Sequence, residues 1–240
     1  MTAAFFQFNP EGKGQTAPSL WQNQNLHYTI VMKMQDIEQH KLNAKKSLAV
    51  AVILFPDEKW INTENNIYVA KNRMIEKVRE REKWDREMSQ VRILANRGSV
   101  IYFLPEKKNE GKGKVYVDTV IDGEIVELKT VSGNRNTLGT AFEQGFKQGA
   151  ALVREYPQLH THSVFIRLFS NLTVGSVKAK IAGELKNRPK NGFFICYFEQ
   201  TKELYTWSYE ELRMLIKKDK KSPGPTIAEP GSAGWDSGAR

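Results

Sequence analysis

The sequence is poor in the residues that build disulfide-linked or cysteine-ligated folds. Only one of its 240 residues, Cys196, is a cysteine. A disulfide framework within the chain and a cysteine-rich zinc site are therefore excluded. Cys196 lies in the apolar run 193–198, where a buried structural thiol is expected. We expect folding in a reducing compartment, with the cytoplasm as the site of action.

Long apolar runs and signal-peptide features are also missing. The start, MTAAFFQFNPEGKG, has neither a basic n-region nor a long apolar h-region. The longest apolar run, 48–55, is too short to span a bilayer. The sequence therefore predicts no membrane span and shows no evident export route.

Acidic residues are outnumbered by basic ones. The net charge is +9 and the pI is about 9.5. Such an excess favours a polyanionic partner, of which nucleic acid is the commonest, although a basic soluble protein without such a partner has the same composition. The 40% share of hydrophobic residues is sufficient for one sizeable core.

Composition divides the chain into three parts. Residues 1–65 form an N-terminal extension of unknown role, 66–217 form the main domain, and 218–240 form a basic, Pro/Gly/Ser-rich tail typical of disorder. Within the extension, β-branched and apolar residues favour strands at 26–34 and 48–55.

The main domain alternates helical and strand patterns, which predicts an α/β (α+β) fold. Trp84, Met88, Val91 and Ala95 recur at helical spacing within 66–97. The other expected elements are strands at 99–104, 115–121, 124–131, 163–169, 193–198 and 204–207, helices at 138–153 and 174–187, and a last helix capped by Ser208.

The strongest local signal is a β-hairpin with an Asp-Gly turn at 122–123. A two-residue turn there places Asp118 directly opposite Glu127. Because side chains alternate along a strand, Lys129 shares their face. The opposite face carries apolar and small residues suited to a core: Val117, Thr119, Ile121, Val126 and Leu128.

Two opposed carboxylates repel, and a divalent cation between them removes that repulsion. Carboxylate oxygens suit Mg²⁺, which can activate a water and neutralise charge on a phosphate. Lys129 can orient the water or stabilise developing negative charge. The alternative is an exposed hairpin face on which Lys129 pairs with Glu127 or Asp118.

Two further residues are candidates on neighbouring helices. Glu87 lies near the buried stripe of its helix, where it either reaches the hairpin as a third acidic ligand or extends to solvent. Gln148, on the small-residue helix after the hairpin, either contacts the scissile phosphate or faces water.

The ordered series of motifs resembles the C-terminal tRNA-nuclease toxin domains of contact-dependent growth inhibition proteins, within the PD-(D/E)xK-like nuclease superfamily. The match covers roughly residues 84–169. Its residues are Glu87, Gly98, Leu104-Pro105-Glu106, Asp118, Ile121-Asp122-Gly123, Glu127, Lys129 and Lys147-Gln148. The chain departs from the family pattern at Val117, which stands where the motif has Pro, and in the strand SVFIRLF, where relatives often carry an apolar run ending in Asp.

The resemblance implies a central mixed sheet flanked by helices and a metal-dependent endonuclease acting on nucleic acid, with tRNA favoured and DNA the other candidate. It implies Mg²⁺ as the divalent cation and an immunity protein as a candidate partner, as for a toxin or mobile-element protein. The implied roles are catalytic for Glu87, Asp118, Glu127 and Lys129, metal-binding for Asp118 and Glu127, and substrate-binding for Lys147 and Gln148.

Two other functions compete with this one. A metal-independent ribonuclease of the barnase, EndoU, colicin or RelE type would use His160 and His162 for acid–base cleavage. A non-catalytic nucleic-acid-binding protein would use the aromatic residues between 197 and 209 and the lysines of 217–221.

Overall fold

The computed structural model describes residues 20–76, 80–105, 117–188 and 191–219. The chain divides into two compact units, Met1–Leu42 and Asn43–Arg240. The compact second unit thus includes residues 43–65, which composition assigned to the extension. The tail 218–240 lies almost entirely outside the described residues.

The predicted strands at 26–34 and 48–55 are wrong, because both segments belong to one helix, α1 (Leu20–Leu54). Neither Gly nor Pro occurs between Pro18 and Pro56, so no backbone breaker interrupts the helix. Near its end, Ala51 and Leu54 are buried in an apolar cluster with residues of the sheet. An apolar run of this length suits a buried strand or a buried helix equally, and tertiary packing decided between them.

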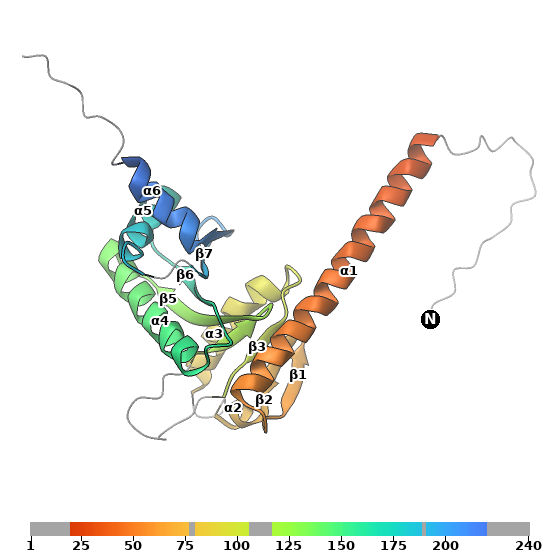
Figure 1. The fold of residues 1–240 in the computed structure, drawn as a ribbon, viewed down its shortest axis with the longest axis horizontal. Helices are drawn as coiled ribbons and strands as arrows, with labels where there is room; N and C mark the ends of the chain where they lie inside the picture. Colours follow the sequence, from red (N-terminus) through yellow and green to blue (C-terminus); the bar gives the residue numbers. More distant parts are fainter. Residues whose placement is uncertain (1–19, 77–79, 106–116, 189–190, 220–240) are drawn as a thin grey trace, which may run out of the picture. The chain divides into compact units, whose positions relative to one another are not determined.

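The second unit is a mixed α/β fold, as predicted. Its described strands form one eight-stranded sheet in sequence order. The strands are β1 (Trp60–Glu64), β2 (Ile67–Ala70), β3 (Ile101–Phe103), β4 (Thr119–Ile121), β5 (Glu124–Val131), β6 (His162–Leu168), β7 (Phe193–Phe198) and β8 (Glu203–Ser208). The helices are α2 (Lys71–Glu76), α3 (Arg81–Ala95), α4 (Arg135–Glu155), α5 (Val174–Glu184) and α6 (Tyr209–Asp219) (Figure 1). The pairs β2–β3, β5–β6 and β6–β7 are parallel, and the other four pairs are antiparallel.

Helices cover both faces of the sheet. Along β6, Phe165 packs in the cluster that contains the apolar residues of α3. Its neighbours Val164 and Ile166 pack in the cluster that contains residues of α4, α5 and α6. Successive strand residues point to opposite faces, so α3 lies on one face of the sheet and α4 with α5 on the other (Figure 1).

The predicted β4–β5 hairpin is confirmed in turn and register. Asp122 and Gly123 both have positive φ, 51° and 91°, as the expected two-residue turn requires. Ile121 pairs with Glu124, and Thr119 pairs with Val126.

The first hairpin strand is shorter than the predicted 115–121, because the chain bends at Asp118 and β4 begins at Thr119. Val117 consequently packs in the cluster that contains Val120. Ile121, Val126 and Leu128 of the predicted core face are buried as expected, in the cluster that contains the apolar residues of α3.

Elsewhere in the second unit the predicted elements are found close to their predicted bounds, with two exceptions. Strand β1 was not predicted. The segment 66–97 is not one helix but β2, α2 and α3, with residues 77–79 outside the description. Ser208 caps α6 as predicted: its Oγ accepts from the Glu211 N–H at 3.1 Å, and Glu211 Oε2 accepts from the Ser208 N–H at 2.7 Å.

Candidate active site on the hairpin

The hairpin brings Asp118 and Glu127 into direct contact. Asp118 N–H donates to Glu127 Oε2 at 3.3 Å, and Asp118 Oδ2 accepts from the Leu128 N–H at 3.1 Å. The bend before β4 thus turns the Asp118 side chain onto the backbone of β5. Glu127 is only 2% exposed. A buried carboxylate beside a second one is costly in an ordinary sheet.

Lys129 connects the carboxylate of Glu127 to α4. Its Nζ lies 2.5 Å from Glu127 Oε1 and donates to Gln148 Oε1 at 2.9 Å. The close approach of α4 depends on Gly145, where a Cβ atom would lie 3.2 Å from Glu127 Cγ. The small residue therefore allows Gln148 to reach the hairpin.

Glu87 enters the cluster from α3, on the other side of Asp118. Its Oε2 accepts from Arg73 Nη2 of α2 at 2.5 Å, and the same nitrogen lies 3.8 Å from Asp118 Oδ1. Lys83 Nζ lies 3.8 Å from the other Glu87 oxygen. The side chain of Glu87 is 12% exposed, so it is held in the cluster and not extended to solvent.

Two carboxyl groups of the cluster have raised pKa values. Burial, followed by the neighbouring charge of Asp118, raises the pKa of Glu127 from 4.5 to about 8, although Lys129 opposes the shift. Burial and then Asp118 also raise the pKa of Glu87, against the opposing charge of Arg73. Shifts with these causes are typical of functional sites, since a merely structural pair has no need to crowd like charges.

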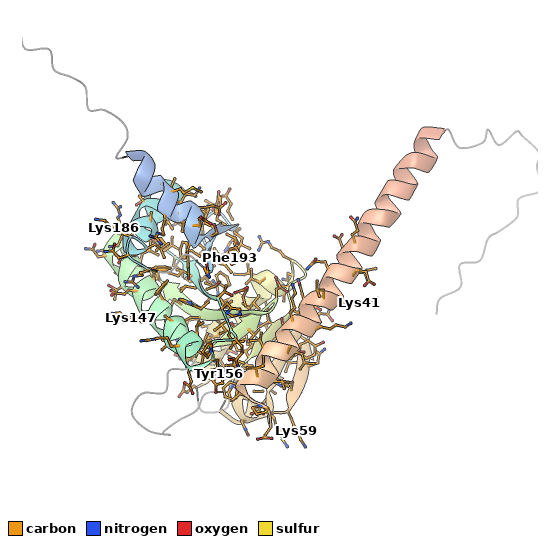
Figure 2. The ribbon with its side chains drawn as sticks, viewed as in Figure 1. Lys41, Lys59, Lys147, Tyr156, Lys186 and Phe193 are labelled. Carbon is orange, nitrogen blue, oxygen red and sulfur yellow. The ribbon has the colours of Figure 1, made fainter. Side chains whose placement is uncertain are left out.

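The structure therefore brings together five of the six site residues named from the sequence: Glu87, Asp118, Glu127, Lys129 and Gln148. Lys147 is not among them. Its side chain is 69% exposed, and its Nζ pairs with Glu143 at 3.0 Å on the outer side of α4 (Figure 2). Glu106 of the Leu-Pro-Glu motif lies outside the described residues.

Sequence reasoning missed Arg73. This arginine is 3% exposed and lies in a short helix within a segment that was expected to be part of one long helix. Neither its spacing nor its neighbours in the sequence connect it to Asp118. A buried arginine among carboxylates is visible only once the chain is folded.

The donor set suits a hard divalent cation. Asp118 and Glu127 supply carboxylate oxygens, the ligands that Mg²⁺ prefers, and Mg²⁺ is commonly held by one or two carboxylates with water completing its shell. A cation there would also relieve the repulsion that raises the pKa of Glu127. Within the described residues, no three His, Cys, Asp or Glu side chains form a group that could hold a metal.

The two histidines of the competing ribonuclease reading lie in different environments. His160 is exposed, whereas His162 is 4% exposed and packs against Phe146 and Tyr209. Burial lowers the pKa of His162 to about 4, so the ring is neutral near pH 7. In this conformation His162 is a core residue with no access to a substrate.

The aromatic residues of the competing binding surface are largely in the core. Tyr197, Trp207 and Tyr209 are each 9% exposed or less. Tyr205 packs against the same core cluster as Trp207. The lysine run that begins at 217 lies outside the residues whose side chains are described.

No protein-family model, curated protein or solved structure significantly matches this chain. Among the helices of the described segments, none combines the length and the apolar character needed to cross a membrane.

Proposed function

We propose that this protein is a metal-dependent endonuclease that hydrolyses phosphodiester bonds in nucleic acid, with a PD-(D/E)xK-like site and tRNA as the favoured substrate. The observation that carries the proposal is the convergence of Glu87, Asp118, Glu127, Lys129 and Gln148. These residues come from α3, the hairpin and α4, and they surround a carboxyl group that is 2% exposed and has a pKa of about 8.

Four of these five residues act at the metal or beside the scissile phosphate in this proposal. Asp118 and Glu127 hold the divalent cation, Mg²⁺, which when bound supplies Lewis acidity to a water and to the scissile phosphate. Lys129 directs its ammonium group towards a phosphate oxygen and stabilises the negative charge that develops there. Gln148 holds Lys129 in position through the 2.9 Å contact between Nζ and Oε1.

The substrate class is supported by charge and by the family resemblance. The net charge of +9 favours a polyanion. The resemblance to tRNA-nuclease toxin domains favours tRNA over DNA, a site of action in the cytoplasm and an immunity protein as partner.

The proposal is tested by incubating total tRNA and plasmid DNA with the wild type, Glu127→Gln and Lys129→Met, in Mg²⁺ and in EDTA. Glu143→Gln and Lys180→Met are matched controls, because each removes one charge of an ion pair within a helix away from the hairpin: Glu143 pairs with Lys147 and Lys180 with Glu184. We expect cleavage in Mg²⁺ by the wild type and both controls, with a loss of roughly 100-fold or more in Glu127→Gln and Lys129→Met.

The substrate that is cleaved identifies the class of nucleic acid. Cleavage that persists in EDTA and in both site variants would refute the hairpin site. Tight binding of tRNA or DNA without cleavage by the wild type would indicate a nuclease-like scaffold used for binding alone.

A further inference from the structure

Arg73 is held by a backbone carbonyl, a carboxylate and an aromatic ring. Nη1 donates to the Leu104 carbonyl at 2.8 Å, and Nη2 donates to Glu87 Oε2 at 2.5 Å. The guanidinium carbon lies 5.1 Å from the centre of the Phe103 ring. With a side chain only 4% exposed, Arg73 has little freedom to leave this position.

This arginine neutralises one side of the carboxylate cluster. Nη2 lies between Glu87 Oε2, at 2.5 Å, and Asp118 Oδ1, at 3.8 Å. An arginine keeps its charge at any physiological pH, and its planar fork holds carboxylates in a fixed geometry. Glu87 and Asp118 therefore have a permanent cation between them that belongs to the chain.

The opposite side of the cluster is neutralised in a different way. There Glu127 pairs with Lys129, whose side chain is 22% exposed. A lysine has a flexible stem and a compact ammonium group, so it can withdraw from Glu127 at lower cost than a buried arginine can leave its partners. An entering cation would displace Lys129 more readily than Arg73.

We propose that Arg73 is a positioning residue that acts as the fixed counterion of Glu87 and Asp118, so that the site takes a single divalent cation, at Asp118 and Glu127. In this arrangement Glu87 is not a metal ligand; it anchors Arg73. The inference rests on the proposed function for the identity of the metal site. It adds the number of cations bound per chain and states which acidic residues bind the cation and which binds Arg73.

Calorimetric titration of the EDTA-treated full chain with Mn²⁺ tests this inference. We expect one Mn²⁺ per wild-type chain. Glu87→Gln should keep that stoichiometry, with an affinity within roughly threefold of wild type, whereas Asp118→Asn should lose roughly tenfold or more. Arg92→Gln is the matched control, because it removes an arginine whose side chain is 49% exposed and pairs with Glu64.

The arginine is tested directly by Arg73→Gln and Arg73→Lys. Without metal, Arg73→Gln should melt at a lower temperature than the wild type, because Glu87 and Asp118 then lose the buried counterion between them and are left with Lys83, 41% exposed and 3.8 Å from Glu87. Mn²⁺ should raise its melting temperature more than it raises that of the wild type, and a second Mn²⁺ should bind. Arg73→Lys keeps the charge and should restore a stoichiometry of one.

Two results would overturn the inference while leaving the proposed nuclease in place. One is the binding of two Mn²⁺ ions to the wild type, and the other is a roughly tenfold loss of affinity in Glu87→Gln. Both results can be measured even if Arg73→Gln does not fold, because they use the wild type and Glu87→Gln. One bound Mn²⁺ without cleavage of any nucleic acid would refute the nuclease and retain the role of Arg73, and no binding to any form would refute both.

Discussion

The pKa of Glu127 leads to a quantitative prediction about stability. Its pKa is raised from 4.5 to about 8 in the folded protein, first by burial and then by Asp118. Between these two values the folded state holds a proton that the unfolded state has released. The contribution of Glu127 to stability is therefore fully present below about pH 4.5 and is lost as the pH rises to about 8.

The magnitude follows from the size of that difference. Each pH unit within the window changes the free energy of unfolding by at most about 1.4 kcal/mol. The whole rise from 4.5 to about 8 corresponds to a loss on the order of 5 kcal/mol for a side chain as buried as Glu127. A loss of this size is a large fraction of the stability of an ordinary domain.

Glu127→Gln isolates this effect because an amide does not titrate. Its carbonyl oxygen still accepts from Lys129, so the substitution adds an offset that varies little with pH. Relative to the wild type, we expect the variant to gain stability steadily from about pH 5 to about pH 8, by a few kcal/mol in total. Urea unfolding in EDTA, followed by far-ultraviolet circular dichroism at each pH, measures the difference.

The control is Glu143→Gln, since the pKa of the partly exposed Glu143 is lowered by its contact with Lys147. That variant should show no gain as the pH rises. If the difference between wild type and Glu127→Gln stays constant across the same range, Glu127 is not a desolvated acid and the electrostatic argument for the site fails.

Three further predictions concern residues outside the cluster. Gly123→Ala should destabilise the protein by about 1–2 kcal/mol, since the φ of Gly123 is +91° and a Cβ there would lie 2.8 Å from Lys46 Cβ. The control Gly175→Ala places its Cβ in open space and should not destabilise the protein; equal urea midpoints for the two variants would contradict this. Ser208→Ala removes the cap of α6 and should cost about 1 kcal/mol, measured as a lower melting temperature; an unchanged value would show that the cap contributes nothing. His162→Phe should cleave nucleic acid like the wild type. Because burial lowers the pKa of His162, the wild type should lose stability as the pH falls from about 6.5 to about 4, and the variant should lack this loss. Equal acid sensitivity of the two proteins would refute this prediction.

The local sequence was sufficient to predict the hairpin. The Asp-Gly pair requires two positive φ values, so it sets the turn, and the turn sets the register up to Thr119 and Val126, next to which the Asp118 N–H donates to Glu127. Lys129 then follows from alternation along the strand. These residues are close in sequence, so their arrangement depends little on the rest of the fold.

The local sequence was not sufficient to predict helix α1. The run 48–55 has the composition of a buried strand, yet it is the end of a helix. Propensities differ by less than about 1 kcal/mol per residue, so burial of Ala51 and Leu54 against the sheet outweighs them.

The sequence by itself determined the carboxylate pair and its lysine, while tertiary structure decided what surrounds them. Glu87 and Gln148 were candidates with two readings each, and only the packing of α3 and α4 on opposite faces of the sheet placed both at the hairpin. Arg73 had no signal at all, because its contacts with Glu87, Asp118 and Leu104 join segments that are distant in the chain. A short-range pattern fixes only what neighbouring residues can impose on one another, and the electrostatic balance of a buried cluster depends on every charge that folding brings to it.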